Sequence, residues 1–472
     1  MRDIFETTIC APATGTGGAI SIIRISGPDA IKVADRIFIA ADRKALEDAG
    51  GYSLHFGTIY EPNSAAEGRS ALDEAVVSVF RSPRSYTGED SVEISCHASP
   101  YIVSRILELL VANGAAMAAP GEFTRRAFVN GKMDLAQAEA VADVISAQTS
   151  AAHRVALNQL KGGFSRELAQ MRSSLLEIAS LMELELDFSE EEVEFADRQK
   201  LRNLVEALLL RTRKMISGFS LGNAIKNGVP VAIAGATNAG KSTLLNCILG
   251  ENRAIVSDVE GTTRDTVEET FNVDGVLFRF IDTAGLRNST DTVEKLGIER
   301  SYRKISEASV ILVLCDLTSD LARMLSIAKD IAGKACEGQK IIFLLNKTDA
   351  VSAADVASAS DSLSVFSGCR VFPVCAMTGE GVDAVLHHIA SIYADMGAGQ
   401  EDSLVTNLRH VEALEAAATS LSRIIPGLDS ATPTDLVAQD LREAIYHLGT
   451  ITGDITTDEV LGNIFRNFCI GK

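Results

Sequence analysis

The sequence predicts a multidomain protein with an α+β N-terminal domain, an all-α helical domain formed from two chain segments, and an α/β domain inserted between those segments. Three observations support this fold class: short β-branched runs in the first third, long helical periodicity after it, and alternating apolar strands and helices in the middle. A length of 472 residues also exceeds that of one ordinary domain. We expect domain boundaries at 1–130, 131–228, 229–394 and 395–472.

The first segment combines strands with one clear helix. Residues 19–25 (AISIIRI), 75–80 (AVVSVF) and 91–95 are rich in β-branched residues and are bounded by turn residues, which is typical of strands. Residues 100–111 have the periodicity of a helix. Together these runs predict an α+β domain of about a hundred residues or slightly more.

Helical periodicity begins after Lys132. Apolar residues recur there at i, i+3, i+4 and i+7, the spacing of one helix face. Three sets predict three bundle helices: Ala138, Val141, Ala142 and Ile145; Leu175, Ile178, Ala179 and Met182; Leu201, Leu204, Val205 and Leu208. Residues 396–402 (MGAGQED) read as a linker, and helical periodicity resumes from Ser403 onward. Because the two helical stretches flank the α/β segment, we expect them to form one domain.

The composition restricts the classes of function. Hydrophobic residues make up 46% and charged residues 23% of the chain, as in soluble globular proteins. No apolar run approaches the roughly 18 residues of a membrane span, and the first ten residues lack the apolar core of a signal peptide, so we expect a cytoplasmic protein without a membrane partner. The eight cysteines have neither disulfide nor zinc spacing. A net charge of -19 argues against a large nucleic-acid surface, so any RNA contact must be local or shared with a partner.

A glycine-rich loop follows the first strand of the α/β segment. Residues 235–242 read G-A-T-N-A-G-K-S, after the apolar run 229–234 and before a helix-like run. This is the context of a phosphate-binding loop. Its glycines let backbone N–H groups point at phosphates, while Lys241 reaches the β and γ oxygens and the Ser242 hydroxyl binds Mg²⁺.

Three further motifs each follow an apolar run. D-T-A-G at 282–285 puts a carboxylate near the metal and a glycine N–H near the γ-phosphate. N-K-T-D at 346–349 ends in Asp349, which can accept hydrogen bonds from guanine N1–H and N2–H₂, donors that adenine lacks in that place. Cys375 and Ala376 can bring a backbone N–H to guanine O6. Four motifs in this order predict a GTP-binding and GTP-hydrolysing protein.

The catalytic machinery is expected between residues 261 and 294. G-T-T-R-D at 261–265 lies where a switch segment belongs, and we assign Thr263 as its magnesium ligand. Many GTPases have a glutamine directly after D-T-A-G to orient the attacking water, but Leu286 occupies that position here. Asp291 and Glu294 are the nearby acidic candidates, and reasoning from the residues leaves both open.

These motifs, together with F-C-I-G-K at 468–472, resemble the tRNA-modification GTPases of the MnmE family, also called TrmE. Further matching segments are 19–27 (AISIIRISG), 85–90 (SYTGED), 120–128 (PGEFTRRAF) and 130–143 (NGKMDLAQAEAVAD), so the resemblance covers essentially the whole chain. It implies a folate-binding N-terminal domain, a helical domain made from both chain halves, and an inserted P-loop G domain. It also implies a homodimer formed through the N-terminal domains.

The resemblance implies a function in tRNA modification. Such proteins act with the FAD-dependent protein MnmG (GidA), in a heterotetramer or larger complex. Together they install a carboxymethylaminomethyl or aminomethyl group at carbon 5 of the wobble uridine (U34) of certain tRNAs. The one-carbon donor is 5-formyltetrahydrofolate or a related tetrahydrofolate. The partner can supply much of the basic tRNA surface that this acidic chain lacks.

The resemblance also implies a set of site residues. Potassium is expected at Asn238, Ser257, Val259 and Thr262, magnesium at Ser242 and Thr263, and Glu294 matches the acid that positions the attacking water. Folate is expected at Arg24, Glu93, Lys132 and Lys472. The full set expected around GTP is Asn238, Ala239, Gly240, Lys241, Ser242, Thr243, Ser257, Thr262, Thr263, Asp282, Thr283, Ala284, Gly285, Asn346, Lys347, Asp349, Cys375 and Ala376.

Some features depart from the family pattern or favour no special role. Cys375 replaces the usual serine of the guanine loop, and His97-Ala-Ser replaces His-Gly-Gly. Cys469 lies close to the expected folate site, but no neighbour in sequence would lower its pKa, so we expect it to pack rather than react. A ribosome-assembly GTPase would carry an RNA-binding module, and a membrane-remodelling GTPase would carry an insertion element. The sequence shows neither.

Overall fold

The structure is a computed structural model of the chain. It describes residues 6–15, 17–63, 68–187, 198–251, 269–281, 306–336, 338–366, 369–397, 404–429, 434–466, 468 and 471. The chain forms two compact units, which we describe separately. Unit 1 comprises Met1–Ile145, Gln159–Leu201 and Arg423–Lys472, and unit 2 comprises Ser146–Asn158 and Arg202–Ser422. The mixed α/β fold class is confirmed, whereas the boundaries of the four-segment division stay a prediction.

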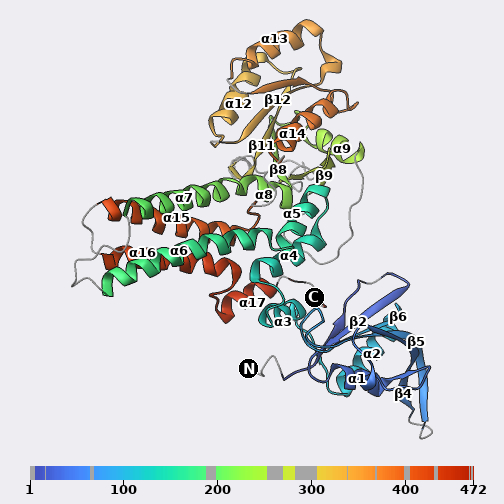
Figure 1. The fold of residues 1–472 in the computed structure, drawn as a ribbon. Coiled ribbons are helices and arrows are strands. Elements are labelled where there is room, and N and C mark those ends of the chain that lie inside the picture. Colours follow the sequence, from blue (N-terminus) through green and yellow to red (C-terminus); the bar gives the residue numbers. More distant parts are fainter. Residues whose placement is uncertain are drawn as a thin grey trace. The chain divides into compact units, whose positions relative to one another are not determined.

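The N-terminal part of unit 1 is a seven-stranded sheet in the order β3-β4-β5-β6-β2-β1-β7 (Figure 1). Its strands are β1 (Ile9–Pro12), β2 (Ile20–Ser26), β3 (Phe38–Ala40), β4 (Ser53–Asn63), β5 (Gly68–Phe80), β6 (Ser91–His97) and β7 (Ala116–Met117). Neighbours are antiparallel except β1 and β7. The main core lies on the face where α1 (Ala30–Ile37) and α2 (Pro100–Ala112) cover alternate strand residues such as Ile23, Val77 and Ile94. A smaller cluster, Ile9, Ala11, Ala118 and Phe123, is buried on the other side of β1.

The opposite face of this sheet carries a different set of side chains. Arg24 lies opposite Glu93 in the β2–β6 register, and Phe56 lies opposite Val76 in the β4–β5 register. Because side chains alternate along a strand, these residues share the face that α1 and α2 leave uncovered. One side of the sheet is therefore core, and the other carries both a candidate ligand pair and exposed apolar groups.

The rest of unit 1 is helical: α3 (Glu122–Val129), α4 (Leu135–Ser146), α6 (Gly163–Asp187), α16 (Thr434–Thr452) and α17 (Asp458–Arg466). Helices α6 and α16 pack together, and α17 packs against α3. The predicted face of α6 is buried along its length, with all four side chains at most 8% exposed. On the predicted face of α4, Ala138 and Val141 are buried, but Ile145 is 47% exposed.

A buried arginine anchors the loop that links β5 and β6. Arg126 of α3 is 1% exposed, and its Nη1 donates to Glu89 Oε1 at 3.1 Å and to Thr7 O at 2.7 Å. Its Nη2 donates to Glu122 Oε1 at 3.0 Å, while Ser26 donates to Glu89 Oε2 at 2.8 Å. Removing one partner of such a buried pair typically costs about 3–5 kcal/mol. Arg126 therefore holds the 85–90 segment against the start of the chain and α3.

Unit 2 contains a six-stranded sheet in the order β13-β12-β11-β8-β10-β9. The strands are β8 (Val229–Gly235), β9 (Glu269–Val273), β10 (Val276–Phe280), β11 (Val310–Asp316), β12 (Lys340–Asn346) and β13 (Arg370–Pro373). Only the β9–β10 pair is antiparallel. The observed strands match the runs predicted before each motif within one or two residues. The chain moves from β8 to β10 on one side and then to β11 on the other, which creates a switch point at the carboxyl ends of the strands.

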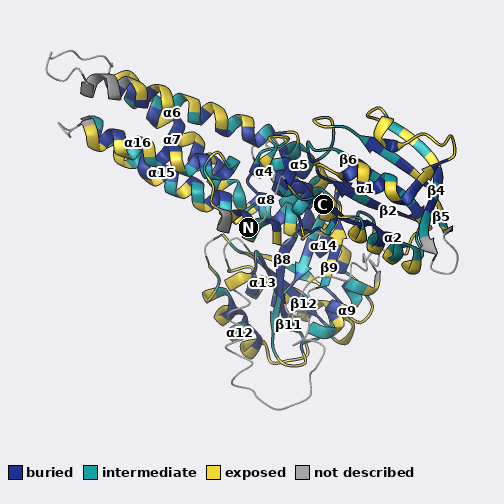
Figure 2. Ribbon diagram, turned by 90° about the horizontal axis from the view of Figure 1, so that it is seen from below, coloured by how far each residue is buried: buried dark blue, intermediate teal, exposed yellow. Residues whose placement is uncertain are grey.

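Helices cover both faces of this sheet. α9 (Lys241–Glu251) and α14 (Val382–Gly397) contribute to the core on one face, and α12 (Leu321–Gly333) and α13 (Ala353–Leu363) contribute to the core on the other. Figure 2 shows the central strands as buried and the outer sides of the helices as exposed. Unit 2 also holds α8 (Phe219–Asn227) and most of α5 (Ser150–Leu160), α7 (Arg198–Ser217) and α15 (Leu408–Asp429). In the described part of the chain, no helix is both long and apolar enough to span a membrane.

Candidate functional site

The phosphate loop joins β8 to α9 in the predicted strand–loop–helix arrangement. Two of its glycines are required sterically. At Gly235 (φ +146°) a Cβ would lie 2.4 Å from Leu314 O, and at Gly240 (φ +97°) it would lie 2.5 Å from Asn346 Nδ2. Asn238 also has a left-handed backbone, with φ of 63°. The loop is thus pressed against the neighbouring strands, with the N-terminus of α9 open to an anion.

Lys241 is the first residue of α9 and folds back over the loop. Its Nζ donates to Ala236 O at 2.7 Å and to Gly235 O at 3.1 Å. Burial lowers the pKa of this amine, because the charged form is less well solvated inside the protein. A phosphate oxygen in the loop could accept the same N–H bonds, and its charge would favour the protonated amine.

Asn346 joins the phosphate loop to the guanine loop. It ends β12, is 2% exposed, and donates from Nδ2 to Ala239 O at 2.7 Å. Its Oδ1 accepts from Ala376 N at 2.9 Å. One side chain therefore fixes the distance between the backbone that would hold the phosphates and the backbone that would face the base.

Lys347 follows with a left-handed backbone (φ 68°), and its Nζ lies 2.7 Å from Asp316 Oδ2 at the end of β11. Burial alone would raise the pKa of Asp316, but the bonds from Lys347 and Thr318 outweigh it and leave that pKa below its usual value. The ion pair links the end of β11 to the loop that follows β12, at the same edge of the sheet.

Cys375 contacts the carboxylate that is expected to recognise guanine. Its thiol donates to Asp349 Oδ1 at 3.1 Å, and the cysteine is 1% exposed while Asp349 is exposed. Sequence reasoning assigned only a backbone role to this residue, although a serine or cysteine next to the N-K-T-D loop is a possible side-chain donor. The buried thiol therefore fixes the orientation of the exposed Asp349 carboxylate.

The backbone donors of the guanine loop are used within the protein. Cys375 N donates to Glu380 O at 2.9 Å, and Ala376 N donates to Asn346 Oδ1. A guanine O6 at this place would share the Ala376 N–H with Asn346. The contact with O6 stays a prediction.

Several predicted site residues lie outside the described residues. They are Ser257, Val259, Thr262, Thr263, Asp282, Thr283, Ala284, Gly285, Asp291, Glu294, Cys469 and Lys472. Their roles stay predictions. The described members, from Asn238 to Thr243 and from Asn346 to Ala376, all lie at the carboxyl ends of β8, β12 and β13.

A second candidate site lies on the uncovered face of the N-terminal sheet. Arg24 Nη2 lies 2.8 Å from Glu93 Oε1, and the two side chains are 18% and 25% exposed. The Arg24 guanidinium lies over the rings of Tyr86 (5.1 Å) and Phe123 (5.8 Å). Burial raises the pKa of Tyr86 despite the bond to Thr124 and the charge of Arg24. The charged pair, flanked by rings, could hold a ligand that is both aromatic and polar.

The last residues of the chain reach this pair, whereas Lys132 does not contact it directly. Arg24 Nη1 donates to Gly471 O at 3.4 Å. Gly471 has φ +96°, and a Cβ there would lie 2.0 Å from Pro12 O. Lys132 is exposed, and its Nζ donates to Pro83 O at 2.9 Å, on the loop that also carries Tyr86. The structure thus brings together Arg24 and Glu93 and places Lys132 at the adjoining loop.

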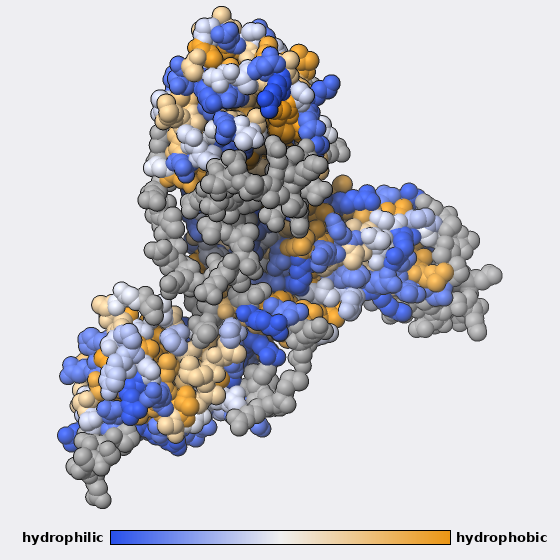
Figure 3. All heavy atoms as spheres, turned by 180° about the vertical axis from the view of Figure 1, so that it is seen from behind, coloured by the Kyte–Doolittle hydropathy of each residue, from blue (hydrophilic) through white to orange (hydrophobic). Residues whose placement is uncertain are grey.

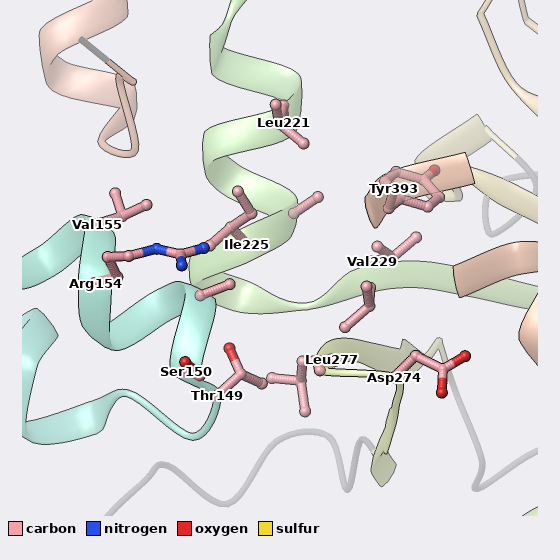
Figure 4. Close-up of a pocket in the computed structure, with 14 residues that line it drawn as sticks. Thr149, Ser150, Arg154, Val155, Leu221, Ile225, Val229, Asp274, Leu277 and Tyr393 are labelled. Atoms are coloured by element: carbon pink, nitrogen blue, oxygen red, sulfur yellow. The ribbon is translucent and has the colours of Figure 1, made fainter. Parts of the chain in front are cut away.

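A separate cavity of about 470 Å³ lies at the other end of the unit 2 sheet (Figure 4). Val229 and Leu277 line it from the starts of β8 and β10, and Arg154 and Ile225 line it from α5 and α8. Tyr393 of α14 also lines it, and burial raises the pKa of that phenol. Because the phosphate loop lies at the carboxyl end of β8, this cavity is not the nucleotide site.

Comparison with known proteins identifies the family. The model of the MnmE helical domain matches residues 135–469, and the model named GTP-binding protein TrmE N-terminus matches residues 8–132. The chain belongs to the MnmE family. The protein called tRNA modification GTPase MnmE is 47% identical in Bacteroides fragilis (strain YCH46) and 48% identical in Parabacteroides distasonis, in each case over 99% of this chain and 100% of the relative. That of Porphyromonas gingivalis is 46% identical over 100% of this chain and 99% of the relative.

Membership in the MnmE family agrees with the geometry. The family is one of GTPases, and the unit 2 sheet carries a phosphate loop and a guanine loop joined by Asn346. The match of one helical-domain model to 135–469 also spans the α/β insertion. The predictions that this is a GTP hydrolase and that it resembles MnmE are therefore confirmed.

The Cys375 thiol predicts a measurable effect on base selectivity. Cys375→Ala removes the donor to Asp349, so we expect GDP affinity to fall about three- to tenfold, because the thiol is a weak donor and its bond contributes about 1 kcal/mol. IDP lacks the guanine amino group and should lose less. Cys375→Ser keeps a hydroxyl donor and should stay close to the wild type. Titration with fluorescent GDP, with IDP as competitor, measures these changes. Equal losses for Ala and Ser would show that the thiol does not orient Asp349.

Proposed function

We propose that this protein uses GTP hydrolysis in the modification of tRNA, installing a carboxymethylaminomethyl or aminomethyl group at carbon 5 of wobble uridine together with the FAD protein MnmG. One observation carries the proposal: Asn346 joins a phosphate loop and a guanine loop in a chain whose full length matches tRNA modification GTPases. The substrate GTP follows from the family and from Asp349, whose carboxylate suits the two guanine donors. The identity of the modified base rests on the resemblance alone.

A tetrahydrofolate is the proposed one-carbon donor, bound on the N-terminal sheet. Glu93 could accept hydrogen bonds from the donor edge of a pterin, and the rings of Tyr86 and Phe123 offer apolar surface beside it. Lys132 and Lys472 are the proposed partners of the glutamate tail. The donor set present around Arg24 therefore fits a flat, polar, anionic ligand.

GTP hydrolysis is proposed to use Mg²⁺ and K⁺. Ser242 and Thr263 would hold magnesium, while Asn238, Ser257, Val259 and Thr262 would hold potassium. The Asn238 side chain is exposed on the phosphate loop, and its amide oxygen is a hard ligand of the kind that potassium prefers. The cations supply positive charge that offsets the charge developing on the phosphates. Glu294 is the proposed residue that positions the attacking water.

The potassium proposal predicts a salt-specific activity. We expect GTP turnover to be at least tenfold faster in KCl than in NaCl at equal ionic strength, because Asn238 would hold an ion of potassium size beside the phosphates. Phosphate release measured in the two salts tests this. In the Asn238→Ala variant, the turnover in KCl should be no faster than in NaCl. Equal rates in both salts would contradict the role of potassium.

Glu294→Gln should lower GTP turnover about 100-fold and leave the affinity for GDP unchanged.

A homodimer through the N-terminal sheet is also part of the proposal. On the sheet face that α1 and α2 leave uncovered, Leu54 is 72% exposed, Phe56 is 56% exposed and Val76 is 38% exposed. Apolar side chains are visible on the surface of the N-terminal part of the chain in Figure 3. Clustered apolar side chains of this kind are typical of protein–protein interfaces. A second copy docked here would lie beside the Arg24–Glu93 pair.

The dimer proposal predicts the effect of one charge. Phe56→Glu should shift the protein to monomer, because a carboxylate would be buried without a partner in the interface. Tyr101→Glu is the matched control: Tyr101 is 65% exposed on α2, across the sheet from the proposed interface, and should leave the dimer intact. Sedimentation velocity separates the two outcomes. A Phe56→Glu dimer as tight as the wild type would exclude this face.

The tRNA function is tested by mass spectrometry of wobble uridine from cells that lack the protein. We expect the carboxymethylaminomethyl and aminomethyl uridines to disappear and to return when the wild-type gene is supplied. A Lys241→Ala variant, which should bind GTP poorly, should fail to restore them. Unchanged wobble uridine in the deletion strain would refute the pathway and leave the GTPase in place.

A further inference from the structure

A pocket of about 380 Å³ lies in unit 1 and shares no lining residue with the sites described above. Helix α6 lines it with Ser165, Arg166, Arg172 and Ser173, and the end of α16 and the following turn line it with Thr452 and Asp454. The two helices pack along their length, so the pocket has a fixed floor of apolar side chains. It is a polar hollow on a rigid helical surface.

Two hydrogen-bond donors in the pocket are buried and unsatisfied. Ser165 is 9% exposed, and neither its Oγ nor the Nε of Arg172 has a hydrogen-bond partner within the described residues. An unpaired buried polar group costs about 1–3 kcal/mol, so native proteins rarely retain one without a reason. An acceptor-bearing ligand would satisfy both donors.

Four charged side chains line the pocket: Arg166, Arg172, Asp134 and Asp454. The Asp134 carboxylate is already engaged, because its Oδ1 accepts from Gln137 N at 2.8 Å. Arg166 Nη1 donates to Lys161 O at 2.8 Å, which keeps these two residues together. The lining is therefore balanced in charge, and Asp454 is the carboxylate that an incoming anion would displace from Arg172.

The one carboxylate paired with Arg172 holds it weakly. Arg172 Nη1 lies 3.5 Å from Asp454 Oδ2, and the two side chains are 32% and 51% exposed. An exposed ion pair this long contributes about 0–1 kcal/mol. An incoming phosphate can make two shorter parallel bonds with a guanidinium, which are stronger. Asp454 is therefore a competitor that a phosphate can displace.

We propose that this pocket between α6 and α16 binds a phosphate of the tRNA backbone, with Ser165 and Arg172 as donors, Arg166 at the rim and Asp454 as the competing carboxylate. The inference rests on the proposed function and adds to it the place where an acidic protein contacts an acidic substrate. A single phosphate contact agrees with the net charge, which leaves no room for a broad basic surface.

The test measures binding of unmodified tRNA to the full-length protein over a range of salt concentrations. Arg172→Gln should weaken binding about tenfold and reduce the slope of log affinity against log salt by about 0.9, the effect of one lost phosphate contact. Asp454→Asn should strengthen binding about threefold, because it removes the competitor. Opposite changes from two partners of one ion pair cannot arise from a loss of folding.

Two controls separate the alternatives. Lys32→Gln removes one positive charge from an exposed helix in the N-terminal part and should leave affinity and slope unchanged, while basal GTPase activity should be the same in all variants. Inorganic phosphate distinguishes the sources of the anion: if it stabilises the wild type but not Arg172→Gln while tRNA binding is equal in both, the pocket binds free phosphate and the proposal is wrong. If the wild type binds tRNA and Arg172→Gln binds it equally with the same slope, the pocket has no role. If the wild type itself binds no tRNA, both the inference and the proposed function fail.

Discussion

The nucleotide site depends on the amide of Asn346. Its nitrogen holds Ala239 of the phosphate loop and its oxygen holds Ala376 of the guanine loop, from a position that is 2% exposed at the end of β12. Both contacts need the neighbouring strand ends in register, because the amide at the end of β12 reaches Ala239 after β8 and Ala376 after β13. Lys347 adds β11 through Asp316, and Cys375 adds the thiol that orients Asp349. The distance between the sites for base and phosphate is therefore a property of the parallel sheet, set before any ligand arrives.

The sheets of the two units offer different places for a ligand to bind. The parallel sheet of unit 2 is covered on both faces, so it can bind only at the ends of its strands, where loops diverge. The largely antiparallel sheet of unit 1 is covered by α1 and α2 on one face, so the Arg24–Glu93 pair and the exposed Leu54 and Phe56 share the other face. A ligand and a second subunit would compete for or share this surface.

Periodicity in the sequence predicted the secondary structure that depends on neighbouring residues. The strands before each motif, the helix from Pro100, and the buried face of α6 were all correct, because alternation and 3.6-residue periodicity are read within a few turns. The apolar periodicity of α4 continues to Ile145, but that side chain is exposed, so the pattern extends beyond the buried part of the helix. The thiol of Cys375 was missed because its acceptor lies 26 residues away, and the bond from Arg24 to Gly471 spans 447 residues. No spacing rule reaches so far. The assignments of Glu294 and of the potassium loop rest on resemblance, since those residues lie outside the described part of the chain.

The contact between Arg24 and Gly471 also sets an order of events in time. The first thirty residues provide the arginine and its strand, but the carbonyl that the arginine contacts belongs to Gly471, 447 residues further along the chain. Helix α17, which ends five residues before Gly471, packs on α3, so this C-terminal segment completes a structure that begins with the N-terminal strands. Residue 471 must therefore be synthesised before this corner can form, long after the strand that carries Arg24. A chain cut after Arg466 would keep its phosphate loop yet lack the contact at Arg24.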